Sequence, residues 1–292
     1  MSTLTETPAP MRAGPAPRPW QLNRRQRTLL TIGLCLLALS AVLAGAWLIG
    51  DDGLATNLAA RNQPPSLAHP FGTDWLGRDM LTRTLHGLSL SLGVGLLAAV
   101  VSAVIGAALG LLAATLGGAA DAVITWVIDV FFSLPHLVLL IMIAFTVGGG
   151  TIGVIVAVAL THWTGLARII RAEVLQLKSA HYVQLSARLG RGPLWVARHH
   201  MLPHLLPQFI VGLILLFPHA ILHEAALSFI GIGLSPHLPA IGIILAEAMR
   251  YLATGSWWLA LFPGLALLLA VTAFDVLGEQ VRDVIEPKQS QG

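Results

Sequence analysis

The stretch TLHGLSLSLGVGLLAAVVSAVIGAALGLLAATLGGAA, Thr84–Ala120, contains no formally charged residue. A bilayer core about 30 Å thick needs roughly 20 apolar residues in helix, so this run predicts a membrane-spanning helix. As one straight helix it would be about 55 Å long, which exceeds that thickness. We therefore expect a bend or an interfacial first segment near five glycines of the run, which are Gly87, Gly93, Gly95, Gly106 and Gly110.

The composition of the whole chain agrees with a membrane protein. Hydrophobic residues make up 55% of the 292 residues and charged residues only 11%, whereas about a quarter of a soluble domain is charged. Most of the surface must therefore face lipid. The net charge of +3 does not indicate nucleic acid as a partner. Cys35 is the one cysteine, which excludes disulfide frameworks and cysteine metal sites.

The remaining apolar runs predict an all-α membrane protein with about six transmembrane helices. Thr28–Gly50 is uncharged and longer than the core of about 7–15 residues in a signal peptide, so we expect an uncleaved anchor, with a cleaved signal as the alternative. Gly148–Gly150 predicts a tight turn between the third and fourth spans. The expected spans are 28–50, 88–116, 122–147, 151–170, 208–230 and 256–280.

The basic residues predict the orientation. If the N-terminus is cytoplasmic, 13 of the 17 Lys and Arg residues fall on the cytoplasmic side, and only Arg61, Arg78, Arg83 and Arg250 fall outside. This asymmetry predicts that both termini are cytoplasmic. The expected segments are a disordered lead-in at 1–27, the anchor at 28–50, an external loop at 51–83, the main membrane domain at 84–284 and a cytoplasmic tail at 285–292.

The longest cytoplasmic connection, residues 171–207, is too polar to span the membrane but has helical patterning. A break is expected from Gly190 to Pro193, followed by a second helical stretch over Leu194–Met201 that Pro203 and Pro207 would close. A helix–turn–helix on this face suits docking to another protein. A structured loop without a partner is the alternative.

At this connection the sequence resembles the permeases of binding-protein-dependent ABC importers. The run HYVQLSARLG, His181–Gly190, followed by HMLPHLLP, His200–Pro207, is similar to their cytoplasmic coupling signature. That signature begins Glu-Ala-Ala, and its charged residue is absent here, so a salt bridge to the ATPase is not implied. The resemblance implies an ATPase-coupling role for Gln184, Leu185, Ser186, Gly190, Gly192 and Leu194.

Three further runs narrow the resemblance to the peptide/opine/nickel group of these permeases. They are FGTDWLGRD at Phe71–Asp79, AALSFIGIG at Ala225–Gly233, and the C-terminal runs Phe274–Gly278 and Arg282–Pro287. The resemblance implies a second permease subunit, expected to form a heterodimer, two cytoplasmic ATPases that bind ATP and Mg, and an external solute-binding protein. No cofactor is expected on this chain itself.

The sequence contains no Gly-x-x-x-x-Gly-Lys-Ser/Thr run, so we expect no ATP hydrolysis by this chain. No nucleophile–base pattern stands out either, and the chain is not expected to be an enzyme. Its predicted task is mechanical, in which ATPase dimerisation moves the cytoplasmic helices and the rigid spans switch access.

Histidines inside the spans are the candidate substrate contacts. His219 and His223 are four residues apart, so one helical face presents both imidazoles, and Glu224 adjoins them. Polar groups at membrane depth usually face a cavity or the bundle interior, which makes these three residues and His162 candidates for the pathway. Imidazole pairs suit nickel, zinc or copper, so His219 and His223 are also a candidate transient metal pair. Interhelical hydrogen bonding is the alternative role.

The substrate expectation follows from these histidines and the resemblance. PHAILH at Pro218–His223 and ALTHW at Ala159–Trp163 resemble nickel and metallophore permeases. We therefore expect import of nickel or another transition metal as a metallophore or opine chelate, with di- or oligopeptides as the alternative. A secondary transporter or channel is less favoured, because inverted repeats and intramembrane charge relays are not evident.

Two groups of charges have expected structural roles. Asp129 in the third span is expected to pair with Arg168 or Arg171, and Pro135 is expected to kink or break that span. In the external loop, Asp74, Arg78 and Asp79 are expected to fix a turn, with contact to the binding protein as the alternative.

Overall fold

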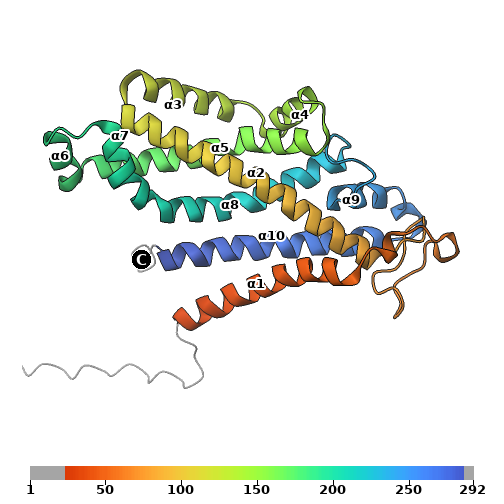
Figure 1. Ribbon diagram of the computed structural model, residues 1–292. Coiled ribbons are helices and arrows are strands. Elements are labelled where there is room, and N and C mark those ends of the chain that lie inside the picture. Colours follow the sequence, from red (N-terminus) through yellow and green to blue (C-terminus); the bar gives the residue numbers. More distant parts are fainter. Residues whose placement is uncertain (1–23, 286–292) are drawn as a thin grey trace, which may run out of the picture.

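The computed structural model describes residues 24–285, and over this range the chain is almost entirely helical (Figure 1). The expectations for residues 1–23 and for the tail beyond residue 285 lie outside the described part. Five of the described helices are long and apolar enough to span a membrane, and a bent helix pair makes a sixth span if it is counted as one. The all-α, multi-span prediction is therefore confirmed.

The long helices are α1 (Arg24–Ile49), α2 (Met80–Leu116), α5 (Gly150–Lys178), α8 (Leu202–Phe229) and α10 (Trp258–Ile285). The bent pair consists of α3 (Gly118–Ser133) and α4 (His136–Thr146). The shorter helical elements are η1 (Asp52–Leu54), η2 (Leu58–Ala60), α6 (His181–Arg188), α7 (Pro193–Val196), η3 (Ala197–Met201), α9 (Ile241–Met249) and η4 (Leu252–Thr254).

Helix α2 runs through the apolar stretch as one continuous helix, with no break at its glycines. Its glycines serve close packing instead. A Cβ atom on Gly106 would lie 2.7 Å from the backbone oxygen of Trp163, and one on Gly110 would lie 2.5 Å from that of Ala167. Small residues of this kind let membrane helices approach closely. Helix α2 accordingly packs along α5 and crosses the bundle obliquely (Figure 1).

The third span is broken, as the proline predicted. Helices α3 and α4 meet at 102°, with Leu134 extended and Pro135 at the N-cap of α4. Asp129 on α3 pairs with Arg168 at 2.9 Å, which confirms the first of the two expected partners. The turn at Gly148–Gly150 is also confirmed, because all three glycines have positive φ.

The polar connection forms α6, α7 and η3, and then runs directly into α8. The expectation that Pro203 and Pro207 would end the helical stretch is wrong, because Leu202–Phe229 continues through both. Pro203 is the second residue of α8, and Pro207 lies inside the helix. The preceding turn, η3, is a π-helix, a form that locally loosens the backbone.

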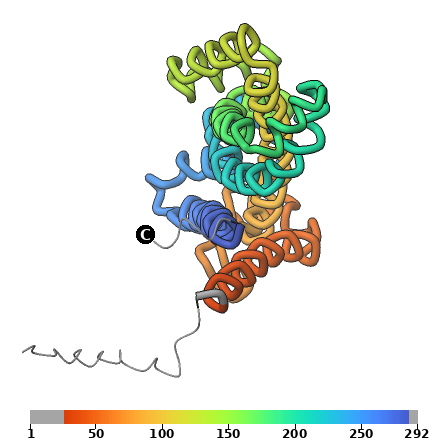
Figure 2. Tube along the Cα trace, turned by 90° about the vertical axis from the view of Figure 1, so that its left-hand side faces the viewer, coloured from red at the N-terminus to blue at the C-terminus, as the bar shows by residue number. Residues whose placement is uncertain are grey.

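The two ends of the bundle differ. The first residues of α1, the last residues of α10 and the α6–α7 connection lie at one end, while the segment 50–79 and α9 lie at the other (Figure 1). Seen along the bundle, α1 lies on the outside beside α10 (Figure 2). Leu37 and Trp47 of α1 are 65% and 83% exposed, which suits a surface in contact with lipid.

The segment between α1 and α2 is fixed by buried charges. Asp74 is 1% exposed, and its carboxylate accepts hydrogen bonds from Arg78 at 2.6 Å and from Arg83 at 2.7 Å. Arg83 also reaches Glu247 of α9 at 2.8 Å. Asp79 caps α2 by accepting from the backbone N–H of Thr82. These contacts support the expected role of the charges in fixing the turn.

Candidate functional site

A cavity of about 560 Å³ opens where the broken span meets α5 and α8. Its walls come from the end of α3, the first residue of α4, the middle of α5 and one face of α8, and Arg282 of α10 also reaches it. The break between α3 and α4 lies at this cavity. Irregular backbone at membrane depth is tolerated where it is buried in protein or lines a cavity, and transporters use broken helices in this way.

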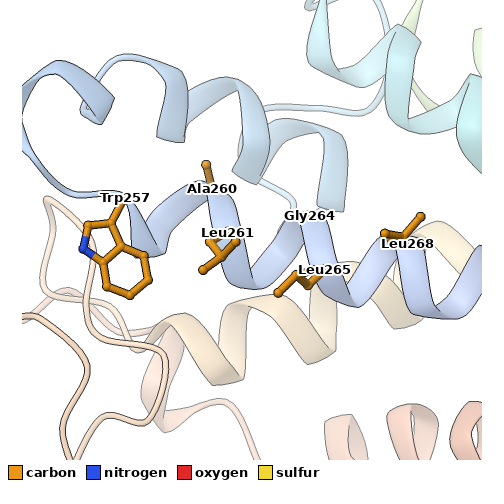
Figure 3. Close-up of a pocket in the computed structure, with 6 residues that line it drawn as sticks. All are labelled: Trp257, Ala260, Leu261, Gly264, Leu265 and Leu268. Atoms are coloured by element: carbon orange, nitrogen blue, oxygen red, sulfur yellow. The ribbon is translucent and has the colours of Figure 1, made fainter.

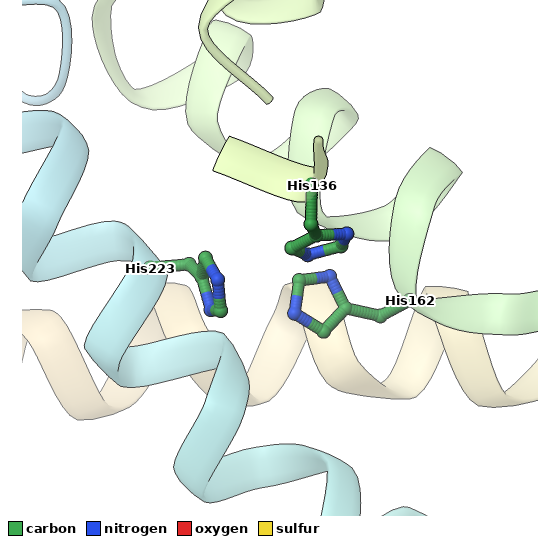
Figure 4. Close-up of side chains that lie close together, drawn as sticks. All are labelled: His136, His162 and His223. Atoms are coloured by element: carbon green, nitrogen blue, oxygen red, sulfur yellow. The ribbon is translucent and has the colours of Figure 1, made fainter. Parts of the chain in front are cut away.

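Three histidines from three helices meet in this cavity (Figure 4). His136 is the first residue of α4, His162 lies near the middle of α5, and His223 lies on α8. Their ring centroids are 4.7 to 4.9 Å apart, and one nitrogen of each ring lies within 4.8 Å of those of the other two. The rings meet edge to face, so the cluster is compact but not stacked.

Backbone carbonyls orient two of the three rings. Nδ1 of His162 lies 3.1 Å from the carbonyl oxygen of Val158, and Nδ1 of His223 lies 2.7 Å from that of His219. A carbonyl oxygen only accepts hydrogen bonds, so each Nδ1 carries the proton and each Nε2 keeps its lone pair. Nε2 of His162 is buried and has no hydrogen-bond partner among the described residues. The cavity thus borders a buried imidazole lone pair, that of His162, with no hydrogen-bond partner among the described residues.

The other predicted pathway residues are placed differently. His219 lines the same cavity one turn from His223 but does not belong to the three-histidine cluster. Glu224 does not line the cavity. It is fully buried, accepts a hydrogen bond from Ser228 at 2.8 Å, and Ser228 in turn accepts from the backbone N–H of Leu234. Glu224 therefore holds the connection from α8 to α9.

His136 is the site residue that sequence reasoning missed. No other histidine lies three or four residues away from His136. Such a spacing is the signal that singled out His219 and His223. The expected break at Pro135 was the available clue, because the residue that follows a broken span at membrane depth is placed to face a cavity.

The predicted coupling residues lie together at the end of the bundle that holds α6 and α7. Ser186 on α6 is 2.9 Å from Nε2 of His200 in η3, and this contact ties the two halves of the connection together. Gly190 has a φ of +82°, which glycine adopts without strain. Leu185 and Leu194 are 59% and 66% exposed. Apolar side chains this exposed on a polar connection suit contact with another protein.

A second hollow, of about 450 Å³, runs along one face of α10 (Figure 3). Its lining is almost entirely apolar and consists of Trp257, Ala260, Leu261, Gly264, Leu265 and Leu268. Without convergent polar groups it offers no means of orienting a solute.

Comparison with known proteins shows which family the chain belongs to. Residues 106–291 match the family described as "Binding-protein-dependent transport system inner membrane component". The chain belongs to this family. The permease is 36% identical over 271 residues to a dipeptide transport system permease protein of Bacillus subtilis, covering 92% of this chain and 84% of the relative. It is therefore a multi-pass inner-membrane permease subunit of a binding-protein-dependent ABC importer, a non-catalytic role.

Other relatives of the permease also have names that refer to peptides. It is 34% identical to a probable D,D-dipeptide transport system permease protein of Escherichia coli and to a glutathione transport system permease protein of Pectobacterium atrosepticum. Each match covers 92% of this chain and 90% of the relative. Membership in the family implies ATP-binding subunits and a solute-binding protein. The names of these relatives do not support the expected nickel or metallophore substrate, and they favour the peptide alternative.

Proposed function

We propose that this permease forms half of the pathway through which an ABC importer takes up di- or oligopeptides. The observation that carries the proposal is the match to peptide permeases over nearly the full length of both chains. The cavity between the broken span, α5 and α8 supports it, because its volume of about 560 Å³ accommodates a small peptide. The partner permease, expected to be a different chain, supplies the other half.

The α6–α7 connection is the proposed contact with the ATP-binding subunits. In this proposal its end of the bundle is cytoplasmic, together with both chain termini. The supporting observations are the distribution of basic residues and the position of α6 and α7 at the same end of the bundle as the start of α1 and the end of α10 (Figure 1). Exposed Leu185 and Leu194 supply the apolar contact that replaces the absent charge of the coupling signature.

In this proposal, the partner subunits supply the free energy for transport. Two ATP-binding subunits hydrolyse ATP with Mg, and their closure moves the α6–α7 connection and rocks the spans. The solute-binding protein docks at the opposite end, where Asp74 and its partners hold the segment 51–83 in place.

A second candidate substrate is a transition-metal chelate. One observation favours it, namely the three imidazoles that meet in the cavity. Neutral imidazoles suit nickel, zinc and copper. A chelate with a peptide-like backbone would account for both the imidazole cluster and the similarity to peptide permeases.

The test is uptake into proteoliposomes that contain the complete importer, with its own partner permease, ATP-binding subunits and solute-binding protein. We expect ATP-dependent uptake of a labelled dipeptide, with no uptake when the solute-binding protein is omitted. Uptake of labelled nickel chelate with no dipeptide uptake would overturn the peptide proposal and favour the second candidate.

A further inference from the structure

Two histidines of the cluster, His162 and His223, have the backbone hydrogen bond that metal-binding histidines usually have. A histidine that binds a metal through one nitrogen usually donates its other N–H to a carbonyl or carboxylate, which fixes the tautomer and the ring. His162 and His223 each hold Nδ1 against the carbonyl of the residue four positions earlier. The remaining nitrogen of His162 is buried without a partner among the described residues. A buried polar atom without a partner is costly, so a ligand for it is expected.

The spacing of the rings suits a metal ion after a small closure. Zinc binds imidazole nitrogen at about 2.0–2.1 Å, so two nitrogens of a tetrahedral shell lie about 3.4 Å apart. The three nitrogens here lie within 4.8 Å of one another. His136 is the most exposed of the three and stands at the 102° break between α3 and α4. Its ring is therefore the one best placed to close on an ion held by the other two.

The ligand set also indicates the class of ion. Three neutral imidazoles favour nickel, zinc or copper over the oxygen-seeking magnesium and calcium. Three protein ligands leave at least one coordination position open, and the cavity lies beside it. A cluster that served only to hold helices together would be expected to contain hydrogen bonds between its rings. Those observed for His162 and His223 run instead to their own helices or to the neighbouring Thr161.

We propose that His136, His162 and His223 form a transient binding site for a divalent transition-metal ion of the nickel, zinc or copper class. The ion crosses the cavity with its remaining ligands supplied by a small peptide-like chelator. The assignment of the chelator rests on the proposed function, whereas the metal site rests on the geometry of the three rings. The site differs from the pair expected from sequence, because His219 lies outside the cluster.

Equilibrium binding of Ni²⁺ to the complete importer in lipid nanodiscs tests the site. We expect one site per copy of this chain, weakened at least about tenfold by His136→Gln, His162→Gln or His223→Gln. His237→Gln is the matched control, because His237 is exposed in the connection between α8 and α9 and belongs neither to the cluster nor to the cavity lining. Glutamine retains a polar side chain, and co-purification of the partner subunits with each variant verifies folding.

Two results would overturn the metal site. One is the absence of saturable Ni²⁺ binding to the wild-type importer, and the other is loss of binding in His219→Gln together with full binding in His136→Gln. Dipeptide uptake by the same wild-type preparation reports separately on the proposed function. Uptake without Ni²⁺ binding refutes the metal site alone, and Ni²⁺ binding lost in the three variants without any dipeptide uptake refutes the peptide proposal alone.

Discussion

Single glycines set how closely α2 approaches its neighbours. Gly110 faces the backbone oxygen of Ala167, and an added Cβ would lie 2.5 Å from it. Gly93 lies on the same helix, and a Cβ added there would meet nothing within 4 Å. The two positions thus separate the effect of the close contact from the effect of the substitution itself.

We expect Gly110→Ala to destabilise the permease by about 1–3 kcal/mol, because α2 and α5 must separate to admit the methyl group. Gly93→Ala is expected to be neutral or slightly stabilising, because alanine favours helix more than glycine does. The measurement is the midpoint of thermal unfolding of the purified complex in detergent. Equal midpoints for the two variants would show that the α2–α5 contact is not as close as described.

The three histidines also show what local sequence cannot predict. The pair at His219 and His223 follows from helical spacing alone. His136 and His162 join His223 only through the break at Pro135 and the packing of α5 on α4. Such contacts between distant segments depend on tertiary structure, so the sequence indicated His162, His219 and His223 as pathway residues but neither His136 nor the grouping of the three rings.

Among the elements, the α6–α7 connection has the most specific predicted role, which is contact with the ATP-binding subunits. Its helices and the break at Gly190 follow from the sequence, and the structure adds which side chains are exposed. Leu185 is 59% exposed on α6. Val284, 58% exposed near the end of α10, is at the same end of the bundle and outside the connection, so it provides a matched control.

We expect Leu185→Glu to leave the basal ATPase activity of the importer intact and to lower its stimulation by loaded solute-binding protein at least about tenfold. Val284→Glu should retain normal stimulation. Normal stimulation in Leu185→Glu would mean that the ATP-binding subunits dock elsewhere.

Prolines explain where the sequence reasoning about elements succeeded and where it failed. Pro135 ends α3 because a proline disfavours the helical conformation in the residue before it, and Leu134 is accordingly extended. Pro203 and Pro207 were expected to end a helix in the same way, yet α8 runs through them. Position within the helix does not account for the difference, because Pro203 is the second residue of α8 whereas Pro207 lies inside it. The sequence around each proline therefore does not show whether a helix ends there.

For the whole molecule, hydropathy was sufficient to predict the fold class and the approximate spans, because the bilayer imposes a length and a composition on each helix. The oblique course of α2, the 102° angle between α3 and α4 and the cavity at that break depend on packing between helices, which hydropathy does not encode. We propose that the solute crosses the membrane through this cavity.

Gly165 offers a direct way to obstruct that route. It lines the cavity, and a Cβ placed there meets nothing within 4 Å, so a larger side chain enters the cavity without displacing a neighbour's backbone. Gly33 on α1 has equally open surroundings and is exposed on the outer helix of the bundle. Phenylalanine at either position adds the same volume to a helix.

The most direct measurement is ATP-driven dipeptide uptake into proteoliposomes by the complete importer containing Gly165→Phe or Gly33→Phe. We predict that Gly165→Phe lowers uptake to background while the importer still assembles, and that Gly33→Phe transports like the wild type. Undiminished uptake by an assembled Gly165→Phe importer would contradict the account, because the solute would then cross the membrane by a path outside this cavity.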